Sequence, residues 1–221
     1  MYSCYVSQIA DGSMKSVHSG DIRTMNSLRT IFLKKHDIIP NATTLVRMTY
    51  DRKDFLRYNV VDDRAKGDGI TRDSTIVSDG LVVTQLGHAL FLPLADCIGA
   101  VIHDPVKNIL MVSHLGRHNL EQFGGTKSIE FLVENFHCDP EDITVWLSPA
   151  AEKDNYPLFA FDNRSMHDVA TEQLLAGGVL AEHITSSPVD TTKDTTYFSH
   201  SEYLKGHRET DGRFAVVTVM K

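Results

Sequence analysis

Short apolar runs separated by polar, turn-forming clusters dominate the middle of the chain, and such runs predict buried β-strands. Strands are predicted at 79–84, 88–94, 98–102 and 109–112. Two of them are followed by polar segments, Ala95-Asp96-Cys97 and the stretch from Ser113 to Asn119. Side chains at the ends of neighbouring strands can meet in space, so we expect Cys97 and His114 to lie within reach of one another in one cleft.

Helical periodicity appears in three stretches, and helices are predicted at 21–36, 119–136 and 165–176. In the first, Met25, Leu28 and Phe32 form one apolar face, and Asp21 is the expected cap. Gly124-Gly125 weakens the second helix and predicts a close approach of its backbone to a packed neighbour. Further strands are predicted at 2–9, 43–50, 143–147, 179–184 and 214–220, and loops at 51–78 and 185–212.

Strands interleaved with three helices predict a single α/β or layered α+β domain spanning residues 1–221. The net charge of −7 argues against a nucleic-acid partner, which requires a basic surface. No run approaches roughly 18 consecutive apolar residues, and the first residues lack a signal-peptide pattern. We therefore expect no membrane partner and a cytoplasmic location. The three cysteines lack the spacing of a disulfide framework.

Cys97 and His114 are the two side chains best suited to metal binding or catalysis. A thiolate and an imidazole suit zinc or copper. They also suit a dyad in which histidine activates a nucleophilic cysteine. An inert buried cysteine beside a histidine of the core is the third interpretation.

Individually weaker candidates accompany this pair. Asp96 is placed to orient the histidine or a bound water, or to cap a turn. His118 follows the first histidine by four residues and is a candidate metal ligand. Ser148 and Tyr156 are candidates for lining the cleft and binding substrate, and Arg213 is a candidate for holding an anion.

Several short motifs follow one another along the chain, each occurring once: Asp79-Gly80-Leu81-Val82, Leu94-Ala95-Asp96-Cys97, His114-Leu115-Gly116-Arg117-His118-Asn119, Leu147-Ser148-Pro149-Ala150-Ala151, Tyr197-Phe198-Ser199 and Asp211-Gly212-Arg213. By these motifs the chain resembles the YfiH-type laccase-domain family, also called polyphenol-oxidase-like or purine-nucleoside-phosphorylase-like. The resemblance covers most of the chain and is best from Asp79 to Tyr156.

The resemblance implies a layered α/β/β/α fold of mixed sheets with flanking helices, shared with cysteine hydrolases. It also implies a metal site of two histidines and one cysteine beside a pocket for a purine nucleoside. The activities implied are phosphorolysis of adenosine and inosine, deamination of adenosine, and copper-dependent oxidation of phenols. The matching positions here make Cys97, His114 and Asp96 the expected catalytic residues.

The chain departs from the family where members have their first metal-binding histidine, because Tyr50 occupies that place. The expected zinc or copper site therefore combines Cys97 and His114 with a substitute ligand, for which Tyr50, Asp51 and His118 are the candidates. The leading hypothesis is a metal-dependent purine nucleoside phosphorylase or deaminase acting on a small molecule. Two alternatives stay open, a metal-free cysteine–histidine hydrolase or deamidase and a non-catalytic relative that binds a small molecule.

Overall fold

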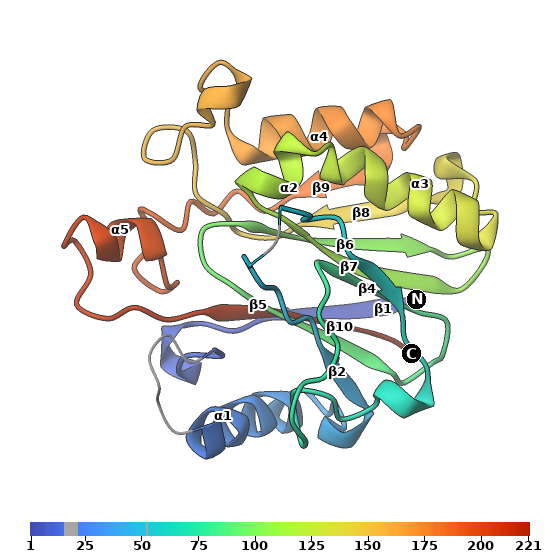
Figure 1. Ribbon diagram of the computed structural model, residues 1–221, viewed down its shortest axis with the longest axis horizontal. Helices are drawn as coiled ribbons and strands as arrows, with labels where there is room; N and C mark the ends of the chain where they lie inside the picture. The colour runs from blue at the N-terminus through green and yellow to red at the C-terminus, as the bar shows by residue number, and fades with distance from the viewer. Residues whose placement is uncertain (16–21, 52) are drawn as a thin grey trace.

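Two β-sheets pack face to face, and helices cover the outer face of each, so the layers run helix, sheet, sheet, helix (Figure 1). The computed structural model describes residues 1–15, 22–51 and 53–221. This arrangement confirms the predicted layered α/β fold. Within the described residues, no helix is long and apolar enough to span a membrane.

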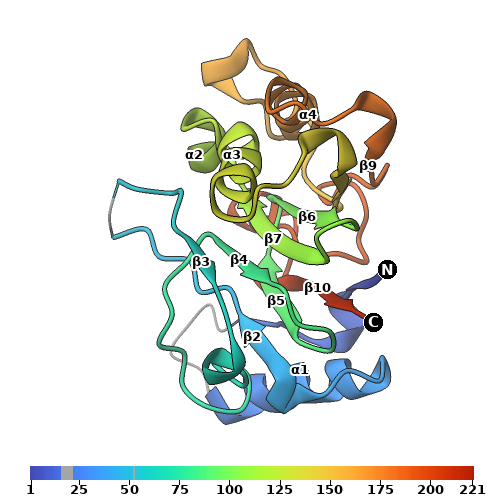
Figure 2. The same cartoon turned by 90° about the vertical axis from the view of Figure 1, so that its right-hand side faces the viewer.

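The sheet beside α1 (Ile22–Lys35) has four strands in the order β1-β10-β5-β2. Their bounds are Tyr2–Val6 for β1, Thr43–Leu45 for β2, Ala89–Leu94 for β5 and Phe214–Met220 for β10. Strand β10 is antiparallel to both β1 and β5, and β2 is parallel to β5. Because Tyr2 pairs with Met220, the two ends of the chain lie side by side (Figure 2).

The second sheet has six strands in the order β3-β4-β7-β6-β8-β9. Their bounds are Tyr58–Val60 for β3, Gly80–Val83 for β4, Ile98–Asp104 for β6, Ile109–Leu115 for β7, Thr144–Leu147 for β8 and Ile184–Ser186 for β9. Its outer face is covered by α2 (Arg117–Glu121), α3 (Gly124–Phe136) and α4 (Met166–Ala176). A short helix, α5 (His200–Leu204), lies beside the end of the two sheets.

Strand β5 is apolar along its whole length because both of its faces are buried. Leu90 and Leu92 belong to the core between the two sheets, whereas Ala89 and Phe91 belong to the core that contains Phe32 of α1. Successive side chains of a strand point to opposite faces, so a strand buried on both faces needs an unbroken apolar run. This is the physical basis of the pattern in the sequence.

The second predicted helix is broken at Phe123, which takes a left-handed conformation with φ +62° and separates α2 from α3. A Cβ on Gly124 would lie 2.8 Å from the carbonyl oxygen of Asn119, so only glycine allows the chain to turn back this closely. A Cβ on Gly125 would lie 2.8 Å from the Cβ of Gln173 on α4. Gly124 thus allows the break between α2 and α3, and Gly125 allows α3 to pack closely on α4, which is the close approach that the sequence predicts.

Other predicted boundaries also differ. The strand predicted at 43–50 is reduced to β2, and the predicted loop 51–78 contains β3. The strand predicted at 179–184 is wrong because Val179 packs into the core beside α4 and pairing begins only at Ile184. The predicted loop 185–212 contains most of β9 and all of α5. The cap expected at Asp21 lies outside the described residues.

Candidate functional site

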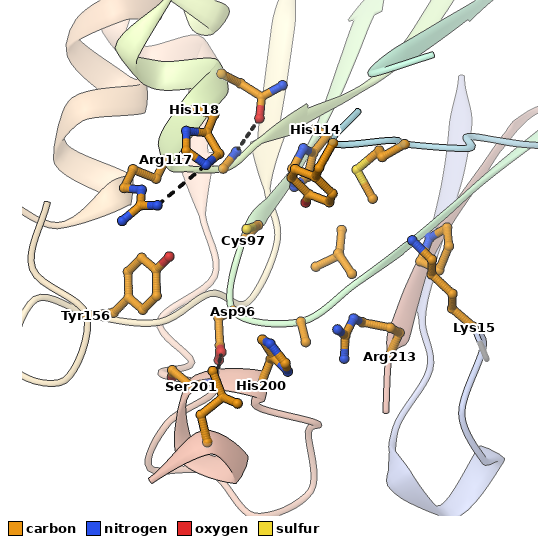
Figure 3. A pocket seen from close by; sticks show the side chains of 18 residues that line it. Lys15, Asp96, Cys97, His114, Arg117, His118, Tyr156, His200, Ser201 and Arg213 are labelled. Atoms are coloured by element: carbon orange, nitrogen blue, oxygen red, sulfur yellow. Dashed lines mark hydrogen bonds between the residues drawn. The ribbon is translucent and has the colours of Figure 1, made fainter. Parts of the chain in front are cut away.

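The cavity that Cys97 and His114 line lies where the chain crosses from one sheet to the other (Figure 3). Strand β5 ends at Leu94 in the four-stranded sheet, and β6 begins at Ile98 in the six-stranded sheet. The three residues between them must therefore turn between the layers, and Asp96 takes φ +68°, a conformation that Asp tolerates better than most residues. The cavity has a volume of about 270 Å³.

Asp96, which lines the cavity, forms hydrogen bonds with three later parts of the chain. Its Oδ1 accepts a hydrogen bond from Thr191 Oγ1 at 2.9 Å, and its Oδ2 accepts one from the backbone N–H of Ser201 at 2.7 Å. Its carbonyl oxygen accepts from the N–H of Ala151 at 2.8 Å. The side chain is buried, and its hydrogen bonds lead to Ser201 in the wall of the cavity and to Thr191 behind it rather than to His114. We therefore assign Asp96 a positioning role.

Cys97 and His114 approach each other beside Gly116. The backbone N–H of His114, near the end of β7, donates to the carbonyl oxygen of Asp79 at 2.8 Å. A Cβ on Gly116 would lie 2.8 Å from Cys97 Sγ and 3.1 Å from His114 Nε2. The sulfur and the nitrogen are thus no farther apart than the sum of these two distances. The structure brings the two side chains together in one cavity, as the strand pattern predicts.

Both members of this pair are electrically neutral near pH 7. Burial, with the Asp96 carboxylate as the second cause, raises the pKa of the Cys97 thiol to about 12. Burial, with the charge of Lys15 second, lowers the pKa of His114 to about 3. A cysteine–histidine dyad needs shifts in the opposite directions, toward thiolate and imidazolium. The electrostatics therefore do not favour a dyad that is preformed before a ligand binds.

Positive charge is in excess around the cavity. The residues with a permanent charge that line it are Lys15, Asp96, Arg117 and Arg213. Arg213 Nη1 is bonded to Asp211 Oδ1 at 2.7 Å. Arg117 has exposed contacts, at 3.9 Å with a carboxylate oxygen of Glu121 and at 3.4 Å with His118 Nε2. Figure 3 shows Arg117 and Tyr156 on one side of the cavity, and Lys15 and Arg213 on the other. Because three cations and one carboxylate are found among the described residues that line the cavity, the cavity favours an anionic ligand.

Aromatic rings form the rim beside α2. His118 stacks on Phe55, with ring centroids 4.7 Å apart, and its Nδ1 lies 3.4 Å from a carboxylate oxygen of Glu121. Tyr50 lies 5.9 Å from the Phe55 ring and is exposed over 61% of its surface. Desolvation of the part that faces protein, followed by the nearby Cys97 sulfur, raises the pKa of the Tyr50 phenol to about 12. The phenol therefore stays protonated near pH 7 and is able to donate a hydrogen bond to a ligand.

The donors at this cavity do not match a zinc or copper site. Across the described ranges, no group of three or more His, Cys, Asp and Glu side chains is arranged to hold a metal ion. Cys97 and His114 are two donors, whereas a catalytic zinc normally has three from the protein. Tyr50 is a protonated phenol, His118 is stacked at the rim, and Asp51 does not line the cavity. The substitute third ligand expected from the sequence is therefore not in place.

Of the three residues expected to bind substrate, two line the cavity and one does not. Tyr156 and Arg213 line the cavity, as expected of residues that contact a ligand. Ser148 is fully buried elsewhere, where its Oγ accepts from the N–H of Gly99 at 2.8 Å and donates to the carbonyl oxygen of Pro149 at 3.0 Å. The role of Ser148 is thus to hold the end of β8 against β6.

Several residues of the site had no signal that sequence reasoning could use. Lys15 reaches the cavity because Met14 N–H donates to the carbonyl oxygen of Arg213 at 2.7 Å, and the N–H of Arg213 donates to Ser13 Oγ at 3.0 Å. His200 lines the cavity because Asp96 holds α5 in place. Lys15 lies in no periodic or motif context, and His200 follows the Tyr197-Phe198-Ser199 motif without belonging to it. Arg117, in contrast, lies inside the quoted histidine motif and could have been selected there.

Comparison with known proteins places the chain among laccase-domain proteins. The family model described as multi-copper polyphenol oxidoreductase laccase matches residues 14–168. A curated protein from Mus musculus, purine nucleoside phosphorylase LACC1, is 35% identical over 72 residues, which are 33% of this chain and 17% of that protein. The match therefore spans less than a fifth of the length of this relative.

Solved structures share the fold over nearly the whole chain. YlmD from Geobacillus stearothermophilus superposes with a TM-score of 0.87 at 18% identity, covering 100% of this chain and 92% of that one. The Bacillus licheniformis protein YfiH superposes with a TM-score of 0.84 at 17% identity, covering 95% of this chain and 85% of that one. At these identities the two structures support the fold alone.

Proposed function

The chain belongs to the multi-copper polyphenol oxidoreductase laccase family, and on that premise we propose that the Cys97–His114 cavity binds a purine nucleoside together with inorganic phosphate and catalyses phosphorolysis of the glycosidic bond. The observation that carries the proposal is the excess of positive charge at the cavity, where Lys15, Arg117 and Arg213 line the space beside the neutral Cys97 and His114. The name of the mouse relative, purine nucleoside phosphorylase LACC1, supports the same reaction class.

The size and lining of the cavity suit this pair of ligands. A volume of about 270 Å³ is close to the lower end of small-molecule sites, which span roughly 300–1,000 Å³. Tyr50, His118 and Tyr156 provide aromatic surface on which a purine can stack. Guanidinium groups match the planar, bidentate geometry of phosphate oxygens, and Arg117 and Arg213 lie on opposite sides of the cavity.

Phosphorolysis needs no co-reactant beyond phosphate. An oxygen of hydrogen phosphate forms a bond to the ribose C1′, the C1′–N9 bond breaks, and its electron pair leaves with the purine. The proton given up by hydrogen phosphate balances the proton taken by the purine. In this proposal Lys15, Arg117 and Arg213 orient phosphate and reduce its repulsion from the departing base. Tyr50 and Tyr156, which have raised pKa values, stay protonated and donate hydrogen bonds to that base.

The metal of the family does not enter this scheme because the donor set is incomplete for it. Deamination of adenosine, the other nucleoside reaction that the family resemblance implies, consumes water instead of phosphate. The cations around the cavity favour the phosphate-dependent reaction. Cys97 and His114 form the neutral floor on which the nucleoside packs.

The test is release of purine base and ribose 1-phosphate from inosine and adenosine, measured by chromatography with and without phosphate. Turnover that requires phosphate and falls at least about tenfold in Arg117→Gln is expected, since hydrogen bonds to charged groups contribute about 1.5–3 kcal/mol. Lys34→Gln removes one exposed positive charge from α1, away from the cavity, and is the matched control. Absence of phosphate-dependent product from both nucleosides overturns the proposal.

A second candidate function, nucleoside binding without turnover, is favoured by one observation. Tyr50 occupies the place of a metal-binding histidine of the family, so the described cavity retains only two of the three donors. Calorimetry with inosine and adenosine distinguishes the two functions. Saturable binding that weakens in Arg117→Gln, without any product, supports the binding protein.

A further inference from the structure

A second cavity of about 370 Å³ adjoins the first, with which it shares Lys15 and Pro93. It lies between the four-stranded sheet, the end of α1 that contains Met25 and Arg29, and the loop that follows Gly69. Apart from Lys15, none of the residues placed in the phosphorolysis reaction or considered as metal ligands lines it. It is therefore a separate feature of the molecule.

Arg29 is buried in the wall of this cavity with 3% of its surface exposed. Its Nε donates to the carbonyl oxygen of Met14 at 2.8 Å, and its Nη1 donates to that of Gly69 at 2.6 Å. Within the described ranges, the only partner recorded for Nη2 is the sulfur of Met25 at 3.3 Å, a weak acceptor. A buried guanidinium thus has one nitrogen whose hydrogen-bonding capacity is largely unused.

The other charges in the wall are also mostly positive. Among the described residues that line the second cavity, the cations are Lys15, Arg29, Arg47 and Arg72, and the one carboxylate is Asp73. Arg47 donates from Nη1 to the carbonyl oxygen of Ser74 at 3.0 Å, and Arg72 donates to the carbonyl oxygen of Arg64. Among the residues that the structure describes, none of the four cations forms an ion pair with a carboxylate. Four gathered cations repel one another, and an anion in the cavity would offset that repulsion.

We propose that the second cavity is a phosphate-binding subsite, in which Arg29, Arg47 and Lys15 hold a phosphoryl group. Its guanidinium groups offer the planar fork that pairs with two phosphate oxygens, and the buried Arg29 provides a fixed anchor. The sharing of Lys15 places this subsite beside the first cavity. The phosphoryl group is therefore either free phosphate or the phosphate of a nucleotide whose nucleoside occupies the first cavity.

The experiment is isothermal titration calorimetry of the full chain with inorganic phosphate, adenosine and AMP at one fixed salt concentration. Arg47→Gln is the main variant because Arg47 is exposed and its single resolved side-chain bond is to a backbone carbonyl. Arg72→Gln is the second variant, since Arg72 is exposed at the same wall. Lys34→Gln is the control for loss of one positive charge, and circular dichroism checks that each variant is folded.

The expected result is that Arg47→Gln weakens phosphate or AMP binding by about tenfold or more, while adenosine binding and the control are unchanged. If AMP binds more tightly than adenosine and this advantage is lost in Arg47→Gln, the phosphoryl group belongs to a nucleotide. If only inorganic phosphate is affected, the ligand is free phosphate. Phosphate and AMP binding that is absent, or equal in the wild type and both variants, overturns the subsite. Binding that is equal in the wild type and both variants overturns the subsite and leaves the phosphorolysis proposal standing, whereas complete absence of phosphate binding contradicts both proposals.

Discussion

Cys97 Sγ and His114 Nε2 converge on one point, lying 2.8 Å and 3.1 Å from where a Cβ of Gly116 would be. The backbone of Gly116 has φ −95° and ψ 179°, an extended conformation that any residue can adopt. Glycine is therefore required here for space and not for backbone freedom. The floor of the cavity depends on the absence of this one side-chain atom.

Gly116→Ala is expected to destabilise the fold by about 1–3 kcal/mol, as overpacking of a full core does, and to weaken adenosine binding. The cause is the contact of the new methyl group with the sulfur and the imidazole. Adding Cys97→Ala should recover part of the lost stability, because the closest atom is removed. Urea unfolding of both single variants and the double variant measures this coupling, and strictly additive effects would contradict the shared contact.

The raised pKa of Cys97 predicts slow alkylation of its thiol by iodoacetamide between pH 6 and pH 8, with labelling rising only in strongly alkaline solution. Peptide mapping by mass spectrometry follows Cys97 separately from the other cysteines. The same protein in urea is the control, where an ordinary thiol with a pKa of about 8.5 should react readily. Fast labelling at pH 6 that is abolished by His114→Ala would instead demonstrate a thiolate–imidazolium dyad.

His114 should make the protein less stable in acid. Its pKa is lowered to about 3 by burial first and by Lys15 second, whereas the unfolded chain has a pKa of about 6.5. Below pH 6.5 the unfolded state thus binds a proton that the folded state does not. The stability contributed by neutral His114 is lost as the pH falls from about 6.5 to about 3.

The measurement for His114 is the free energy of unfolding of wild type and His114→Gln between pH 7 and pH 4. The advantage of the wild type should shrink by roughly 3 kcal/mol over this range. His88→Gln is the comparison, because burial lowers the pKa of His88 to about 4 and a shallower loss is expected. Parallel curves for wild type and His114→Gln would mean that His114 is accessible to protons in the folded protein.

The buried Asp79 and the half-buried Arg57 form an ion pair that supports the rim carrying Tyr50. Arg57 Nε lies 2.7 Å from Asp79 Oδ2, and Arg57 Nη2 donates to the carbonyl oxygen of Thr49 at 2.8 Å. Asp79→Asn should cost about 1–3 kcal/mol, because it leaves the half-buried guanidinium of Arg57 without its charged partner. It should also weaken adenosine binding by displacing the residue before Tyr50.

Urea unfolding and calorimetry with adenosine provide the two readouts for Asp79→Asn. Lys127→Met, which removes an exposed pair with Glu130, is the control and should change the unfolding free energy by less than about 1 kcal/mol. Equal effects of the two substitutions would show that the Arg57–Asp79 pair is no more important than a surface contact.

The sequence predicted the central strands and the meeting of Cys97 with His114 because both depend on local order. An unbroken apolar run such as 88–94 indicates a strand that is buried on both faces. A polar residue directly after such a run indicates where the strand ends. The departures came where a single backbone conformation or a packing contact decides the structure. Phe123 breaks a periodic helix with one left-handed residue, and Val179 is apolar because it packs beside α4 rather than in a strand.

Only the tertiary structure determines which charged residues line the cavity and which of its polar groups already have hydrogen-bond partners. Lys15 and Arg213 come from opposite ends of the chain and are brought together by hydrogen bonds between Ser13, Met14 and Arg213, which no local pattern encodes. The motif that contains Asp96 predicts a catalytic carboxylate. In the fold, however, its two carboxylate oxygens accept hydrogen bonds from Thr191 and Ser201. Residue type and periodicity determine which segments are buried. Sheet order and the turn between the sheets determine which charges face the same space and which are already satisfied.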